Sequence, residues 1–395
     1  MAGEKYLNLY IGNHGKPDGI EDYVVLITSL MAKRGVQVRI SSAYDPQAVN
    51  LVIDEFTNYV ENHRLAAFKK AYPRSKIVFI LTEFAVRKWG VTSFNHFGGL
   101  VDAAAIALSD VYLRLIRDDF GRPTLAGMLK LLLYSPILAL EIVPGFLRAA
   151  VGALIGRRVR HGGYQRAHHS TIYFHMRYLG LMASLRYADA IIASHEKIID
   201  GFSRQIGSGG EPLQYFGVVY PELEERDVLD QLMATKKLFI EVTGSVTPYR
   251  QEWIERINQQ LILLGLQRVF GSCISLPFSL LAADKPVDRG AYSLHPPQTR
   301  NWPYCSPTRI FRALSVDHNL PILTHHFHQN PIEDLCFVFE NQESIVELYE
   351  MYADPVRLRN FIEPKVKSYN DFVVACNDAL VEKLRVTMDA QERAG

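Results

Sequence analysis

Several features that define specialised classes of protein are scarce or missing in this sequence. Only four of its 395 residues are cysteines, without CxxC spacing or a paired framework, so unreactive thiols in a reducing cytoplasm are expected. The formal net charge of +1 gives no overall attraction to nucleic acid, and no nucleic-acid partner is predicted. No uncharged stretch reaches the roughly 18 residues of a spanning helix, and no signal peptide is expected.

What the sequence does contain is the composition of an ordinary globular protein. Hydrophobic residues make up 48% and charged residues 22%, which argues against disorder. The length suits two domains of roughly 150–200 residues each. Strand-like and helix-like stretches alternate over the first half, which predicts a parallel sheet covered by helices. The predicted strands are 7–11, 36–41, 51–53, 77–81 and 190–193, and the helices between them include 20–34 and 55–71.

A second alternation follows a glycine-rich and acidic stretch that predicts the domain linker. Its predicted strands are 238–242, one within 268–276, 291–294, 320–324 and 333–339, with helices over 251–264 and from Pro307 to about Asn319. We therefore predict the α/β class, with two Rossmann-like domains whose parallel sheets face each other across a cleft. The predicted parts are an N-terminal domain (1–206), a linker (207–235), a C-terminal domain (236–369) and a C-terminal helix (370–395).

An apolar insertion at about 100–170 interrupts the rhythm of the first domain. Its residues 125–156 are broken by two prolines and three charges, and basic residues follow them. Two interpretations are open: two short helices packed inside the protein, or a patch over about 125–166 that lies on an anionic membrane surface. The second interpretation predicts a cytoplasmic protein located peripherally at the inner face of the membrane.

The stretch 292–324 carries the most informative pattern, a strand, a loop, a helix and a second strand. Pro307 at the first helical position, preceded by Ser306, marks a helix N-terminus. Backbone N–H groups, the positive end of the helix dipole, two hydroxyls and Arg309 therefore converge at one point, which predicts an anion site, most naturally for phosphate.

Two further loops of the second half also follow predicted strands. Together with the helix start they predict a diphosphate site. The candidate residues are Thr243, Gly244, Ser245 and Arg250 in the first loop, His295 and Arg300 in the second, and Ser306, Thr308 and Arg309 in the third. A run of three histidines at 325–328 has no second cluster of ligands, so no metal site is predicted.

Titratable residues also follow the strands of the first half. His14 lies in a glycine-rich loop directly after the first strand, and its ordinary pKa suits a general base near neutral pH. Asp18 on the same loop is the alternative base. Glu83 and His195 follow later strands and are candidates for the acceptor side, against capping or packing roles. The loop around His14 does not match GxGxxG, so no dinucleotide motif is indicated.

This layout resembles the GT-B glycosyltransferases, whose two Rossmann-like domains face each other across a cleft. The stretch ADAIIASHEKIIDGF is similar to the last strand and helix of their acceptor domain, and KKLFIEVTGSV to the opening of their donor domain. SPTRIFRALSVDHNLPILT is similar to their phosphate-binding helix and following strand, with Asn319-Leu320-Pro321-Ile322 in place of a G-x-P-V pattern.

The resemblance implies a metal-independent transferase with no cofactor, using a nucleoside-diphosphate sugar as donor in the second domain. It implies acceptor binding by the first domain, and the insertion suggests a lipid-linked or envelope glycan as acceptor. No glutamate occurs between Glu255 and Glu333, so the paired glutamates of many retaining members are absent, and Arg312-Ala313 stands where the second Glu-Ala would fall. An epimerase or hydrolase acting on sugar nucleotides, and a non-catalytic nucleotide- or glycan-binding protein, are the alternatives.

Overall fold

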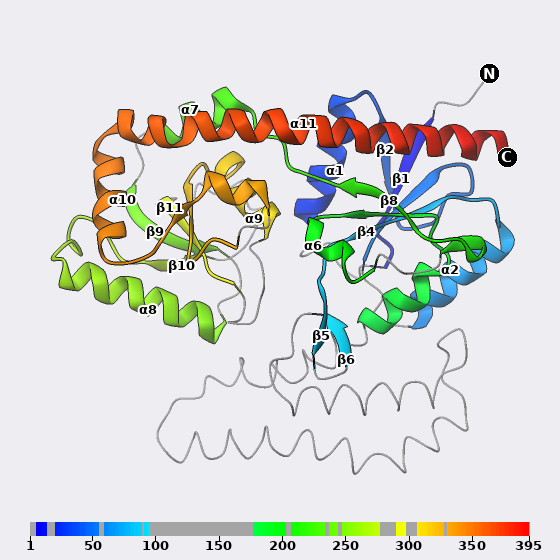
Figure 1. Cartoon of the computed structure of the whole chain (residues 1–395), viewed down its shortest axis with the longest axis horizontal. Helices are drawn as coiled ribbons and strands as arrows, with labels where there is room; N and C mark the ends of the chain where they lie inside the picture. Colours follow the sequence, from blue (N-terminus) through cyan, green and yellow to red (C-terminus); the bar gives the residue numbers. More distant parts are fainter. Residues whose placement is uncertain are drawn as a thin grey trace, which may run out of the picture.

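The computed structural model describes residues 5–13, 20–54, 59–88, 91–94, 177–202, 207–233, 237–243, 247–276, 290–297, 306–327 and 330–394. Within them the chain forms two parallel sheets with helices packed against them, and Figure 1 shows the two sheets side by side. The predicted α/β class with two Rossmann-like sheets is therefore confirmed. The predicted insertion at about 100–170 lies outside the described residues.

The first sheet has six strands in the order β2-β1-β3-β4-β7-β8, and every neighbouring pair is parallel. Its elements along the chain are β1 (Tyr6–Tyr10), α1 (Glu21–Lys33), β2 (Gln37–Ser41), β3 (Val49–Ile53), α2 (Tyr59–Ala71), β4 (Ile77–Leu81), β7 (Ala190–Ala193), α6 (Glu196–Ile199) and β8 (Gln214–Val218). A short antiparallel hairpin, β5 (Ala85–Lys88) and β6 (Val91–Phe94), follows β4 and was not predicted.

The inner strands of this sheet are buried on both faces. In β4, Ile77 and Phe79 belong to one apolar cluster and Val78 and Ile80 to the other, as the alternation of side chains along a strand requires. This double burial explains why β4 is an unbroken apolar run instead of an alternating one.

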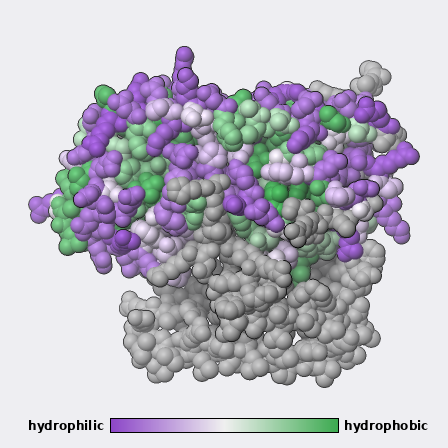
Figure 2. Space-filling view, viewed as in Figure 1, coloured by the Kyte–Doolittle hydropathy of each residue, from purple (hydrophilic) through white to green (hydrophobic). Residues whose placement is uncertain are grey.

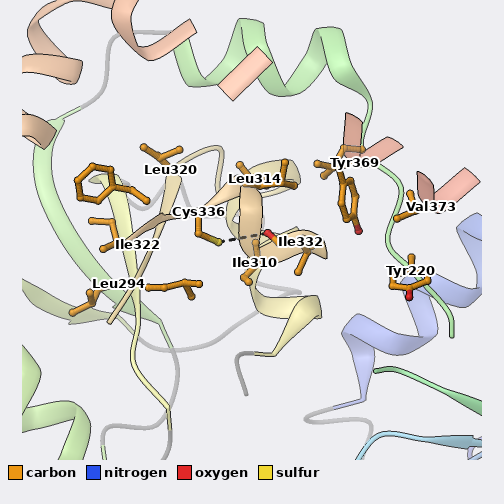
Figure 3. Packing of buried hydrophobic residues seen from close by; sticks show 14 of the residues in the cluster. Tyr220, Leu294, Ile310, Leu314, Leu320, Ile322, Ile332, Cys336, Tyr369 and Val373 are labelled. Atoms are coloured by element: carbon orange, nitrogen blue, oxygen red, sulfur yellow. Dashed lines mark hydrogen bonds between the residues drawn. The ribbon is translucent and has the colours of Figure 1, made fainter. Parts of the chain in front are cut away.

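The second sheet has five strands in the order β10-β9-β11-β12-β13, again all parallel. Its elements are α7 (Glu225–Met233), β9 (Lys237–Thr243), α8 (Pro248–Leu263), β10 (Ile274–Leu276), β11 (Gly290–His295), α9 (Pro307–Ser315), β12 (Leu320–Leu323), a 3-10 helix η3 (Pro331–Leu335), β13 (Phe337–Val338) and α10 (Glu343–Ala353). Figure 3 shows Ile310 and Leu314 of α9 packed against the sheet residues Leu294, Leu320 and Ile322, which fixes the position of α9.

A single helix of 40 residues, α11 (Pro355–Ala394), packs on both sheets. Its Ile362 and Val366 belong to the cluster that contains the second-domain core, while Leu380 and Leu384 pack in the first domain. Figure 1 shows the helix running across both domains. At 1.5 Å per residue it is about 60 Å long, enough to hold the two domains together.

The segment between the two sheets is tied to α11. Asn377 accepts a hydrogen bond from the backbone nitrogen of Tyr220 (3.1 Å) and donates one to its carbonyl oxygen (2.9 Å). The predicted linker at 207–235 contains β8, the edge strand of the first sheet, and the domain bounds stay a prediction. The predicted strand 333–339 was too long, because Glu333 lies in η3.

The described surface is mixed in character. In Figure 2 hydrophilic residues alternate with hydrophobic ones over the described part of the face in view. Within the described ranges, no helix has the length and apolar character needed to cross a bilayer. The apolar stretch at about 125–166 lies outside those ranges.

Candidate active site

The helix α9 begins as the sequence predicts, with Ser306 as N-cap and Pro307 in the first turn. The Ser306 hydroxyl makes no capping bond to the helix backbone and instead pairs with the hydroxyl of Thr308 (Oγ to Oγ1, 3.0 Å). Thr308 is almost fully buried, whereas Ser306 and Arg309 are partly exposed. Two paired hydroxyls therefore lie at the positive end of α9, with Arg309 in the same first turn of the helix.

Two other predicted residues gather near the same helix start. His295 is the last residue of β11, and Arg250 lies in the first turn of α8, where its Nε donates to the carbonyl oxygen of Pro296 (3.2 Å). Burial, together with the positive charges of Arg309 and Arg250, lowers the pKa of His295 to about 3. A neutral imidazole at the end of β11 thus lies near the positively charged guanidinium groups of Arg309 and Arg250.

The remaining predicted residues of the diphosphate site are less fully described. Thr243 ends β9, but its side chain lies outside the described residues, as do Gly244, Ser245 and Arg300. Thr247 caps α8 by accepting a hydrogen bond from the backbone nitrogen of Arg250 (3.3 Å). Two of the three predicted loops therefore follow β9 and β11, and the third is the start of α9; their shared role stays a prediction.

In the first domain, polar groups follow β3 and β4. Asp54 accepts a hydrogen bond from the backbone nitrogen of Thr82 (2.9 Å), which ties the ends of the two strands together. Burial raises the pKa of Asp54 to about 7, although the charge of Arg177 opposes that rise. The predicted residue Glu83 pairs with the same arginine, Oε1 to Nη1 at 3.2 Å. Burial also raises the pKa of Glu83.

Asp54 and Arg177 were not predicted. Asp54 could have been found, because it directly follows the buried strand β3, whereas Glu83 stands one residue further from the end of β4. Arg177 could not have been found, since it lies 94 residues from its partner Glu83.

His195, predicted for the acceptor side, is the N-cap of α6. Its Nδ1 accepts a hydrogen bond from the backbone nitrogen of Lys197 (3.1 Å), and its side chain is fully buried. Burial lowers the pKa of His195 to about 4, so the ring is neutral near pH 7. Its Nδ1 is committed to the cap, so this geometry supports the capping alternative.

The first turn of α1 brings the two domains together. Helices α1 and α9 are in contact, and the hydroxyls of Ser194, after β7, and Thr308, in α9, both influence the pKa of Tyr23 in α1. Burial raises the pKa of Tyr23 above its ordinary range, and the carboxylates of Glu83 and Asp54 act in the same direction. Helix α1 therefore lies between the polar residues that follow the strands of the first sheet and the helix α9 of the second domain.

The remaining candidates from the sequence are the predicted bases and the histidines after β12. His14 and Asp18, the predicted bases, lie outside the described residues. His325 contacts Thr324 (3.2 Å), while His326 lies beside Glu333 (3.4 Å). Within the described chain, no three histidine, cysteine or acidic side chains gather as a metal would require.

Arg312, which stands where the resemblance places a glutamate, forms a buried ion pair with Asp317 (Nε to Oδ2, 3.1 Å). The side chain at this position of α9 is therefore held by the loop that follows the helix.

No protein-family model matches this sequence, and no curated protein does. Among solved structures, it is similar to an alpha-glucosyltransferase in complex with UDP and a 13-mer DNA containing a HMU base, at 8% identity over 98% of this chain and 100% of that chain, with a TM-score of 0.43. It is also similar to an alpha,alpha-trehalose 6-phosphate synthase from Burkholderia multivorans, at 10% identity over 88% of this chain and 99% of that chain, with a TM-score of 0.35. The fold assignment rests on the two parallel sheets of this chain.

Proposed function

We propose that this protein is a glycosyltransferase that moves a sugar from a nucleoside-diphosphate sugar to an acceptor hydroxyl. The observation that carries the proposal is the convergence of Arg250, His295 and Arg309 at the start of α9. The site lies at the carboxyl ends of the strands of a parallel sheet, where α/β folds bind their ligands.

The charges of this edge suit the departure of a nucleoside diphosphate. Negative charge develops on the leaving phosphate as the bond to the sugar breaks. Two guanidinium groups and the positive end of α9 stabilise that charge without a metal ion. Neutral His295 adds a hydrogen-bonding group. Unlike an anionic side chain, it does not compete with the phosphate for the two guanidinium groups.

The acceptor side of the proposal belongs to the first domain. The acceptor hydroxyl must lose a proton as it attacks, and we assign that step to His14 or Asp18 in the loop after β1. To Glu83, held by Arg177 on one oxygen, we assign the acceptance of a hydrogen bond from an acceptor hydroxyl. The acceptor class that we propose is a lipid-linked or envelope glycan.

A thermal-shift screen over nucleoside diphosphates and nucleotide sugars tests the donor. One nucleotide series is expected to raise the melting temperature, since a ligand at 100 times its dissociation constant adds about 2.7 kcal/mol of stability. Product analysis with and without glycan acceptors then identifies the reaction. Turnover of the donor alone to an epimer or a free sugar would favour the epimerase or hydrolase alternative. Binding without any turnover would favour a non-catalytic protein.

The membrane part of the proposal has its own test. Flotation with anionic liposomes at low salt should recover the protein with the vesicles, and added salt should release it. If the protein stays in solution at low salt, the apolar stretch is packed inside the protein and the acceptor is not presented at a membrane.

A further inference from the structure

His295 has a buried ring nitrogen to which no described residue makes a hydrogen bond. The residue ends β11, the middle strand of the second sheet, and pairs in register with Leu323 of β12. It is 9% exposed, and its Nε2 is buried without a hydrogen-bond partner among the described residues. His195, which directly follows the end of β7, differs because its Nδ1 accepts a bond from the backbone nitrogen of Lys197 (3.1 Å). A buried polar atom without a partner is costly, so one at the ligand edge of a sheet points to a ligand.

Arg250 is fixed beside His295 by a hydrogen bond to the next residue of the chain. Its Nε donates to the carbonyl oxygen of Pro296 (3.2 Å), and the arginine is itself almost fully buried. Helix α9, which carries Arg309 in its first turn, is in contact with β11. Burial and the charges of both arginines lower the pKa of His295, so its ring is neutral near pH 7. The unpartnered nitrogen therefore belongs to a neutral ring at the same edge as the groups proposed to hold the diphosphate.

The groups at this edge differ in the hydrogen bonds that they can make. Guanidinium groups and the backbone nitrogens of a helix start are donors only, which suits phosphate oxygens because these are acceptors. A sugar hydroxyl also donates, and its hydrogen needs an acceptor. The hydroxyls of Ser306 and Thr308 are paired with each other at 3.0 Å. Neutral His295, in the tautomer that carries its proton on Nδ1, offers Nε2 as such an acceptor.

We infer that His295 determines the specificity of the donor site for the sugar: its Nε2 accepts a hydrogen bond from a hydroxyl of the donor sugar, while the arginines bind the diphosphate. The inference rests on the proposed function, because it assumes a nucleoside-diphosphate sugar at the start of α9. The hydrogen bond to His295 is lost once the sugar has been transferred. It therefore favours exchange of the spent nucleoside diphosphate for a new donor.

Calorimetric titration of the full-length protein with matched pairs of ligands tests the inference. The pairs are UDP with UDP-glucose, ADP with ADP-glucose and GDP with GDP-mannose, and the pair that binds wild type most tightly is used. His295→Ala should weaken binding of the nucleotide sugar by about tenfold, the scale of one hydrogen bond, and that of the nucleoside diphosphate by less than about twofold. His295→Gln keeps a hydrogen-bond acceptor and should lose less affinity for the nucleotide sugar than His295→Ala does.

Two controls separate this role from others. Arg309→Ala should weaken both members of the pair to the same extent, because the diphosphate is common to them. Without ligand, His295→Leu should not lower the melting temperature, because it removes an unpartnered polar atom from the interior. A lower melting temperature in His295→Leu, together with loss of both ligands, would show that the ring supports the fold and would overturn the inference.

The remaining outcomes distinguish the inference from the proposed function. Equal losses for both members of the pair in His295→Ala would place the imidazole at the diphosphate and overturn the inference, while the donor site stands. Unchanged affinity for both members would overturn it as well. If no pair binds wild type, the donor site itself is contradicted, and the inference with it.

Discussion

Arg250 donates a hydrogen bond from Nε to the carbonyl oxygen of Pro296, over a distance of 3.2 Å. This bond joins the first turn of α8 to the loop after β11, two segments that are 46 residues apart in the sequence. It holds one guanidinium beside His295, while α9 supplies the second, that of Arg309. The proposed site is therefore assembled by backbone geometry before any ligand binds, which is the condition for effective electrostatic stabilisation.

Replacement of His195 should affect stability through the cap of α6. His195→Ala removes the acceptor for the Lys197 backbone nitrogen and should lower the free energy of unfolding by about 1 kcal/mol, whereas His195→Asn can still cap and should cost less. Denaturant unfolding at pH 7.5 measures both. Equal losses in the two variants would show that the cap is not the source of the effect.

His195 should also make the protein less stable in acid. Its pKa is about 4 in the folded state against an ordinary 6.5, so the unfolded state binds more protons between these values. The stability that wild type holds over His195→Asn should therefore be complete above pH 6.5 and should fall as pH drops toward 4, by up to about 1.4 kcal/mol per pH unit. Unfolding curves of both proteins at several pH values give this difference, and a flat difference would contradict the burial of a neutral ring.

The contribution of Asp54 to stability should change with pH in the opposite direction to that of His195. Its pKa is about 7 in the folded state against an ordinary 3.8, so the folded state binds more protons over that window. The stability of wild type relative to Asp54→Asn should therefore fall as pH rises from 4 to 7. The same set of unfolding curves measures it. A relative stability that rises with pH would mean that Arg177 and Thr82 outweigh the cost of burying this charge.

Arg177 and Glu83 should be strongly coupled. Arg177→Met leaves the mostly buried Glu83 without the partner at 3.2 Å and should destabilise the fold by about 3–5 kcal/mol. The double variant Arg177→Met with Glu83→Gln should recover much of this loss. A double-mutant cycle with Glu83→Gln alone gives the coupling energy, and simple additivity would show that the two groups do not depend on each other.

The sequence predicted most of the fold because local patterns set it. The bounds of β4 and β7 were predicted without error, since both are short, fully apolar runs typical of buried parallel strands. The edge strand β8 was missed because its first two residues are exposed and it follows a glycine-rich segment typical of linkers. The hairpin β5–β6 was missed because its short strands, AVRK and VTSF, contain polar residues and lack the apolar run that marks β4 and β7.

The candidate site was predicted only where it is local in sequence. The start of α9 could be identified from Ser306, Pro307 and Arg309 because capping chemistry is short-range. The contact of α1 with α9 joins segments from different halves of the chain, so no local pattern indicates that Ser194 and Thr308 both influence Tyr23. Pairings of this kind exist only once the two sheets have folded.

The central claim, a diphosphate site at the start of α9, is tested most directly by calorimetry with Arg309→Ala. The titrant is the nucleoside diphosphate that stabilises the wild type most in the thermal-shift screen. The variant should lose about 1.5–3 kcal/mol of binding free energy, the scale of a hydrogen bond to a charged group. Arg268→Ala, which removes an exposed arginine of the same domain, should bind as wild type does. An unchanged affinity in Arg309→Ala would contradict the account.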